Sequence, residues 1–199
     1  MRNGFKMLFV IALMLLAQTR AVPTTANFVG ITQNPEVFVA VITSQEKAIA
    51  YICDGQNLAQ WYRGTLQAGG LFEARSTTGK TRITAQINSR SVLGMVSLEG
   101  GETLSFRAAE QVDKAQAVGQ VIGQVAGLYR SDDNIDNQRW LGGWIVLPNG
   151  EQRGSIFGGG STRPGRKLEL RANFAGVDLP ELGLIQPFRV TSEWLAALK

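Results

Sequence analysis

The stretch EVFVAVITSQEKAIAYICDG, residues 36–55, decides the fold class predicted for this chain of 199 residues. Residues 37–42 and 48–53 are two continuous apolar runs, separated by the polar residues 43–47. Apolar runs this short, and largely β-branched, are typical of strands that are covered on both faces. With a turn at Asp54-Gly55, the stretch predicts a buried β-hairpin.

A second hairpin of the same kind is expected further along the chain. Residues 140–147 are largely apolar, and residues 148–150 are Pro-Asn-Gly. Residues 151–157 follow as the candidate second strand. Pro-Asn-Gly is typical of a type I turn followed by glycine, which is a common way to close a hairpin. The segment therefore predicts two strands that meet at residues 148–150.

Short runs with glycine-rich turns fill the chain between and after these hairpins. In residues 82–88, Ile83, Ala85 and Ile87 share one face, and residues 103–108 alternate in the same way. Runs of this kind at intervals of about ten residues are typical of antiparallel meanders. The chain is predicted to be all-β, as an antiparallel meander barrel or a related sandwich.

Two segments depart from this strand pattern. Residues 110–125 carry apolar residues at helical spacing, but two glycines in the segment lower its helix propensity. A short helix or a crossover loop is expected there. At the C-terminus, Ser192 is a candidate N-cap for a short helix over residues 193–199.

The N-terminal residues predict a secretory signal peptide. Residues 1–6 are basic, residues 7–17 are apolar and uncharged, and Ala21 stands at a suitable cleavage position. This apolar run is much shorter than the roughly 20 residues that span a membrane, so cleavage is favoured over retention as an anchor. We expect a signal peptide at 1–21 and a single β-rich domain at 22–199, with halves at about 28–108 and 126–191. The protein is expected to be secreted or periplasmic.

The net charge of the exported chain limits the classes of partner that we expect it to bind. The full sequence has 20 basic and 16 acidic residues, but removal of residues 1–21 takes away three basic residues and no acid. The remaining chain has 17 basic and 16 acidic residues and is close to neutral. A near-neutral domain lacks the electrostatic footprint of a nucleic-acid-binding protein. The expected partner is a small molecule or an envelope protein, with no nucleic acid and no stable membrane span after cleavage.

Two compositional features argue against an enzyme. The chain has no histidine, which removes Ser-His-Asp catalysis and His-ligated zinc. Its one cysteine, Cys53, ends an apolar run and is expected to be a buried small hydrophobe. We therefore predict a non-enzymatic protein without a cofactor.

Three segments resemble parts of uncharacterised secreted bacterial proteins. They are Tyr51-Ile52-Cys53-Asp54-Gly55, Gly127-Leu128-Tyr129-Arg130, and residues 142–150, Gly-Gly-Trp-Ile-Val-Leu-Pro-Asn-Gly. The resemblance covers most of residues 28–157. It implies export and β-structure, and it implies no activity.

Two loops have spacings that are typical of ligand-binding loops. Asp132, Asn134 and Asp136 occupy the first, third and fifth positions of a calcium-type loop, but its glycine and its final glutamate are missing. A solvated turn is therefore favoured over a calcium site, and no metal is expected. Residues 158–167, GGGSTRPGRK, resemble a phosphate loop only superficially, so a flexible hairpin loop is expected. Its basic residues are candidates for contact with an anionic surface.

The residues expected to contact a ligand are aromatic: Trp61, Tyr62, Tyr129, Trp140 and Trp144. Aromatic faces stack on sugars or line apolar pockets, although large aromatics are more often part of the core. The favoured function is an exported β-barrel protein that binds a small apolar or glycan ligand inside the barrel or at its mouth.

Two alternatives stay open. An envelope structural or protein-interaction module would have a filled barrel with an exposed apolar patch or an unpaired edge strand. A carboxylate-based hydrolase would place two acids about 5–10 Å apart in a cleft. Glu73, Glu102 and Glu151 are candidate acids for the hydrolase.

Overall fold

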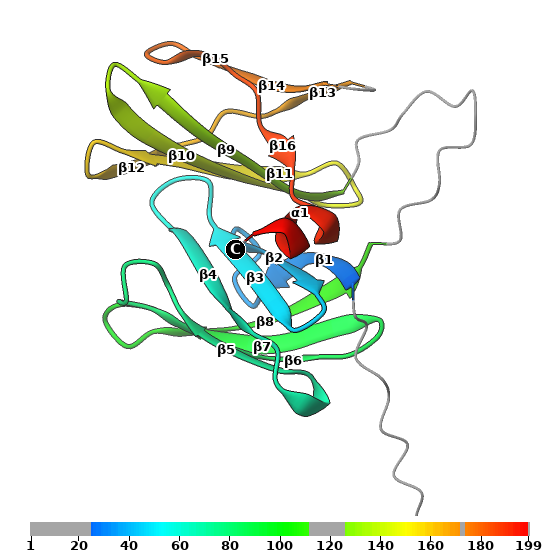
Figure 1. Ribbon diagram of the computed structural model, residues 1–199. Helices are drawn as coiled ribbons and strands as arrows, with labels where there is room; N and C mark the ends of the chain where they lie inside the picture. Colours follow the sequence, from blue (N-terminus) through cyan, green and yellow to red (C-terminus); the bar gives the residue numbers. More distant parts are fainter. Residues whose placement is uncertain (1–24, 112–125, 172–173, 199) are drawn as a thin grey trace, which may run out of the picture.

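The computed structural model describes residues 25–111, 126–171 and 174–198. As predicted, the described elements are almost all antiparallel strands, and they form three sheets (Figure 1). The predicted signal peptide lies outside the described residues, and so does nearly all of the predicted helix or crossover at 110–125. Among the residues that the structure describes, no helix has the length and apolar character needed to cross a membrane.

The first eight strands form one sheet in the order β4-β3-β2-β1-β8-β7-β6-β5. A short 3-10 turn at Ala68–Gly70 precedes β5. The strands are β1 (Thr25–Thr32), β2 (Phe38–Ser44), β3 (Lys47–Cys53), β4 (Ala59–Thr65), β5 (Leu71–Arg75), β6 (Arg82–Ile87), β7 (Ser91–Ser97) and β8 (Thr103–Glu110).

The edge strands of this sheet, β4 and β5, nearly close it into a barrel. Two isolated antiparallel bridges join them, Tyr62 with Ser76 and Leu66 with Phe72. Both bridges keep one register, which sets Gly64 opposite Ala74 between them. A Cβ on Gly64 would lie 3.5 Å from the Ala74 Cβ, so the two strands approach to ordinary van der Waals contact. The predicted barrel is therefore confirmed, with a loosened seam.

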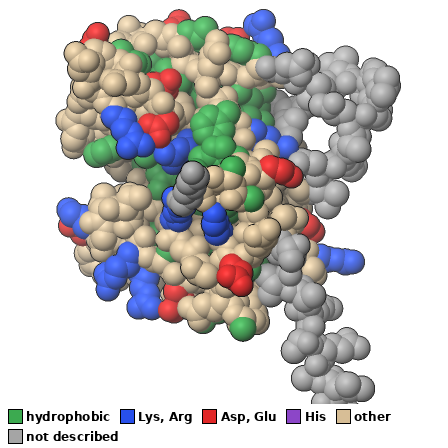
Figure 2. Space-filling model, in the orientation of Figure 1, with side chains coloured by type: hydrophobic (Ala, Val, Ile, Leu, Met, Phe, Trp, Pro, Cys, Tyr) green, Lys and Arg blue, Asp and Glu red, His purple; other side chains and the backbone are tan. Residues whose placement is uncertain are grey.

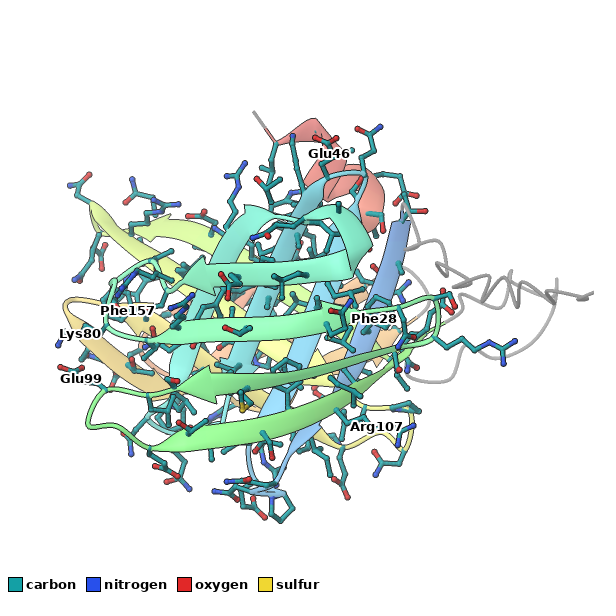
Figure 3. All side chains as sticks on the ribbon, turned by 90° about the horizontal axis from the view of Figure 1, so that it is seen from below. Phe28, Glu46, Lys80, Glu99, Arg107 and Phe157 are labelled. Carbon is teal, nitrogen blue, oxygen red and sulfur yellow. The ribbon has the colours of Figure 1, made fainter. Side chains whose placement is uncertain are left out.

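The predicted hairpin at residues 36–55 forms β2 and β3, and every residue of β2 is buried. The strands pair from Phe38 with Cys53 to Ser44 with Lys47. Alternate side chains point to opposite faces of a strand. One set faces the barrel interior with Phe28 of β1 (Figure 3). The other set faces the second sheet, which explains why both faces are apolar.

The second half of the chain forms two further sheets. One has the order β12-β11-β10-β9-β16 and the other has the order β13-β14-β15. The strands are β9 (Gly127–Ile135), β10 (Gln138–Val146), β11 (Gln152–Gly158), β12 (Ser161–Pro164), β13 (Glu169–Arg171), β14 (Phe174–Leu179), β15 (Gly183–Ile185) and β16 (Phe188–Arg189), followed by helix α1 (Ser192–Ala197).

The second predicted hairpin is confirmed as β10 and β11. Its turn has the expected hydrogen bond, in which the Gly150 N–H donates to the Leu147 carbonyl at 2.9 Å. Gly150 has φ +85°, a left-handed conformation that glycine adopts without a steric cost. The Pro-Asn-Gly signal therefore located this turn correctly.

Three local predictions are wrong. Residues 131–135 were expected in a loop but continue β9, paired with β10 up to Ile135 opposite Gln138. Residues 158–167 were expected to be a flexible loop, but they contain the edge strand β12, which ends at Pro164 as an edge strand tolerates. The C-terminal helix is present, but its N-cap is Thr191 and not Ser192, because the Thr191 Oγ1 accepts from the Trp194 N–H at 3.2 Å.

The three sheets stack in layers (Figure 1). Apolar cores lie inside the barrel and between the layers. One core fills the barrel, a second lies between the barrel and the sheet of β9–β12, and a third lies beneath β13–β15. Helix α1 packs into the second core through Leu195. The second sheet is therefore covered on both faces, like the hairpin of β2 and β3.

Candidate binding groove between the barrel and the second sheet

A polar groove of about 300 Å³ lies where the barrel meets the second sheet. The barrel contributes Glu36 and residues 54–56, and the second sheet contributes Trp144 and residues 152–154. The segment after β12 contributes residues 165–167. Because parts far apart in the sequence converge here, only the folded chain contains this site.

A capped turn shapes the barrel wall of the groove. The Asp54 carboxylate follows β3, and its Oδ1 accepts three backbone N–H groups. The donors are Gln56 at 2.7 Å, Asn57 at 3.0 Å and Leu58 at 3.0 Å. This is an Asx-type turn, in which the side chain replaces backbone partners. It fixes the course of residues 54–58 beside the second sheet.

The opposite wall is held by contacts to Trp144. The Trp144 Nε1–H donates to the Arg166 carbonyl at 2.9 Å, and the Gly165 N–H donates to the Gly154 carbonyl at 2.7 Å. A Cβ on Gly154 would lie 2.0 Å from Trp144 Cδ1, so glycine is required for the indole to lie over this strand. These contacts tie the basic segment at residues 165–167 to β10 and β11.

Three basic side chains line the groove: Arg153, Arg166 and Lys167. Arg153 is engaged, because its Nη2 donates to Glu36 Oε2 at 2.6 Å and its guanidinium lies 4.8 Å from the centre of the Phe38 ring. Within the described part of the chain, neither Arg166 nor Lys167 forms an ion pair. Both are exposed. Arginine forks match carboxylate and phosphate oxygens, and lysine adds a mobile positive charge. The groove can therefore accept an anionic group.

The five aromatic candidates do not converge on one site. Tyr62 lies inside the barrel, where its hydroxyl is 2.8 Å from Thr81 Oγ1. Trp61 faces the second sheet, while Tyr129, Trp140 and Trp144 share the core beneath β13–β15. Of the five, only Trp144 lines the groove.

Trp61 belongs to an aromatic cluster at the junction of the two sheets. Its ring centre is 4.4 Å from that of Tyr51, and the Arg130 guanidinium lies 4.9 Å from the Trp61 ring and 5.8 Å from the Trp194 ring. Figure 2 shows hydrophobic side chains gathered between the two parts of the molecule, with charged side chains beside them. This arrangement joins the sheets and leaves Trp61 little exposed surface.

The calcium candidates lie on β9 and in the turn that follows it. Arg139 and Arg130 both donate to Asp132, and the hydrogen bond from Arg139 is the main cause that lowers the pKa of Asp132 to about 2. Asn134 is on the same strand, and Asp136 lies in the β9–β10 turn. The described residues contain no group of three or more histidine, cysteine or acidic side chains that could hold a metal ion.

The acids considered for hydrolysis lie on separate elements. Glu73 is on β5 and pairs with Arg82 at 3.1 Å. Glu102 immediately precedes β8, and Glu151 immediately precedes β11. The two acids that share a groove are Glu36 and Asp54, which the sequence did not single out.

The sequence also contains a Ser-x-x-Lys spacing at Ser44-Gln45-Glu46-Lys47, which makes Ser44 a candidate nucleophile with Lys47 as its base. It spans the turn between β2 and β3, where Ser44 pairs with Lys47. The Lys47 Nζ donates to the carbonyls of Ala196, at 3.2 Å, and of Leu198. Its observed partners are thus the last carbonyls of the C-terminal helix, a common role for lysine.

Comparison of the chain with protein-family models, with curated proteins and with solved structures gives no significant match. The function is therefore argued from the groove and its charges.

Proposed function

We propose that this chain is an exported, non-enzymatic binding protein that holds a small anionic ligand in the groove between the barrel and the second sheet. The observation that carries the proposal is the placement of Arg153, Arg166 and Lys167 around one groove of about 300 Å³. This volume is at the lower end of the range of pockets that hold small molecules.

The balance of charge in the groove supports an anion over a neutral ligand. Its acids are Glu36, which pairs with Arg153, and Asp54, whose Oδ1 accepts three backbone N–H groups. Arg166 and Lys167 are left without an acidic partner among the described residues. A ligand carboxylate, sulfate or phosphate would supply that partner.

The same contacts favour binding over hydrolysis. Catalytic carboxylate pairs act as an acid and a base or nucleophile, and both must reach the substrate. Glu36 and Asp54 each make bonds that hold the walls of the groove, through Arg153 and through the 54–58 turn. A binding role uses the groove as it is, with both acids kept in these contacts.

Calorimetric titration of the purified chain with sulfate and acetate at low ionic strength tests the proposal. We expect saturable binding that weakens at least tenfold in the Arg166→Gln, Lys167→Gln double variant. Arg90→Gln is the control, because Arg90 is exposed and lies outside the groove. Binding that is unchanged in the double variant, or absent in the parent chain, would refute the anion site.

A second candidate function, an interaction module, is supported by apolar side chains on the outer face of the barrel. Ile31, Leu93 and Met95 are 42%, 52% and 53% exposed. Ile31 and Leu93 flank Arg107 across β1, β8 and β7. Sedimentation analysis tests this role: self-association that Leu93→Lys abolishes would support it, and a monomer at all concentrations would count against it.

A further inference from the structure

A smaller, mostly apolar pocket of about 180 Å³ lies beside the basic segment that lines the groove. It opens between β11, the end of β12 and the turn that joins β14 to β15. Its apolar wall is made by Ile156, Pro164, Leu179, Pro180 and Leu182. Such a wall suits a hydrocarbon chain and offers little to a polar ligand.

Arg166 belongs to both the groove and this pocket. The backbone around it is anchored, because the Arg166 carbonyl accepts from Trp144 Nε1 and the neighbouring Gly165 N–H donates to Gly154. Pro164 lines the apolar pocket, Gly165 lines the polar groove, and Arg166 lines both, so this segment lies between the two. An arginine suits such a boundary, since its stem is apolar and its guanidinium is charged.

The other charged residues of the pocket neutralise each other. Arg163 and Glu181 both line it, and the Arg163 Nη1 donates to Glu181 Oε2. Arg166 is therefore the pocket residue whose charge has no acidic partner among the described residues. An anion held by Arg166 would sit at the border of the groove, with the apolar pocket next to it.

We infer that the ligand is a short anionic amphiphile, with its carboxylate held by Arg166 and Lys167 and its apolar chain in the pocket of Leu179 and Leu182. The inference rests on the proposed anion site and adds the chemical class of the ligand. A methylene group takes roughly the space of a water molecule, about 30 Å³, so the pocket of about 180 Å³ has room for about six carbons.

A chain-length series tests the inference. The purified chain is titrated by calorimetry with alkyl carboxylates from acetate to decanoate, below their micelle concentrations, and with octan-1-ol. We expect the affinity to rise about fourfold for each added methylene, which corresponds to about 0.8 kcal/mol of apolar transfer. The rise should level off beyond about six carbons in the chain, when the pocket is full. Octan-1-ol should bind at least tenfold more weakly than octanoate, because it lacks the charge.

Two variants separate the apolar pocket from the anion site. Leu182→Ser should flatten the chain-length dependence without changing the affinity for acetate, and Arg166→Gln should weaken every acid in the series. Leu184→Ser is the matched control, since Leu184 is 60% exposed on the adjacent strand and lies outside the pocket.

The outcomes that overturn this inference differ from those that overturn the anion site. Equal affinity from acetate to decanoate would refute the amphiphile and leave anion binding intact. Octan-1-ol that binds as tightly as octanoate, with no effect of Arg166→Gln, would refute the anion site itself. Chain-length dependence that survives Leu182→Ser unchanged would place the apolar chain elsewhere and overturn the inference.

Discussion

Arg153 of β11 donates to Glu36 of the barrel at 2.6 Å, across 117 positions of sequence and across the groove. The Arg153 side chain is 28% exposed and the Glu36 side chain is 69% exposed. The pair is therefore partly exposed to solvent, and an exposed ion pair contributes at most about 1 kcal/mol to stability. Its main consequence is that Glu36 neutralises the Arg153 guanidinium, which could otherwise bind an anionic ligand.

Replacing Glu36 should therefore strengthen anion binding. In Glu36→Gln the amide cannot neutralise Arg153, so we expect the affinity for acetate to rise several-fold in calorimetric titration, while the free energy of unfolding changes by about 1 kcal/mol or less. Glu99→Gln is the control, because Glu99 pairs with Lys80 at 3.0 Å between the β7–β8 and β5–β6 turns (Figure 3), and neither residue lines the groove. Weaker binding in Glu36→Gln would contradict the competition between Glu36 and the ligand.

The junction of the two sheets should be sensitive to a single added methyl group at Gly143. A Cβ there would lie 2.5 Å from Tyr51 Cζ and 2.9 Å from Trp61 Cζ2, closer than side chains tolerate. We expect Gly143→Ala to lower the free energy of unfolding in urea by about 1–3 kcal/mol, the usual cost of overpacking.

Gly79→Ala controls for the change from glycine to alanine. Nothing lies within 4 Å of a Cβ at Gly79, so its cost comes only from a backbone with φ +75°. If Gly143→Ala proves no more destabilising than this control, the close packing of Tyr51 against β10 is disproved.

The hydrogen bond between Tyr62 and Thr81 inside the barrel should stabilise the folded state more than a solvent-exposed hydrogen bond does. Tyr62→Phe removes the partner of the buried Thr81 hydroxyl, 2.8 Å away, and leaving such a group unpaired costs about 1–3 kcal/mol. Adding Thr81→Val removes the orphaned hydroxyl and should recover part of that loss. A double-mutant cycle measured by urea unfolding gives the coupling energy, and purely additive effects would count against this bond.

Acid should weaken the β9–β10 hairpin through Asp132. The hydrogen bond from Arg139 lowers the pKa of Asp132 to about 2, so the carboxylate stabilises the folded state above the ordinary pKa. This stability is lost as the pH falls from about 4 to about 2, because the unfolded chain binds the proton first.

An NMR titration of the side-chain carboxyl carbons checks this pKa directly. In Arg139→Gln the Asp132 pKa should return toward its ordinary value, with only the Arg130 contact left to lower it. A pKa that is unchanged by the substitution would assign the shift to another cause.

The fold was predictable where the local sequence of a strand or a turn was enough to indicate its structure. Residues 36–55 are apolar on both faces because the barrel interior and the second sheet cover them, and Pro148-Asn149-Gly150 specifies its turn locally. The end of β9 was missed because Asp132 and Asn134 carry no apolar alternation, and pairing with β10 determines the strand instead. Tertiary pairing overrides local propensity in such cases.

The candidate groove was less predictable than the fold. Its cations come from β11 and from the segment after β12, and its acids come from the barrel, so no window of sequence contains the site. Only the basic residues of the segment 158–167 had been linked to anions. The aromatic candidates were chosen for their chemistry, but the structure divides them among three cores, with Trp144 alone at the groove.

The most direct test of the anionic-ligand groove follows the indole N–H signals of the four tryptophans by NMR during titration with octanoate. Trp144 donates its indole hydrogen to the Arg166 carbonyl at the groove, whereas Trp61, Trp140 and Trp194 do not line it. We predict a saturable shift of the Trp144 signal alone, which Arg166→Gln abolishes. A Trp144 signal that stays in place at saturating octanoate, or that moves equally in Arg166→Gln, would contradict the account.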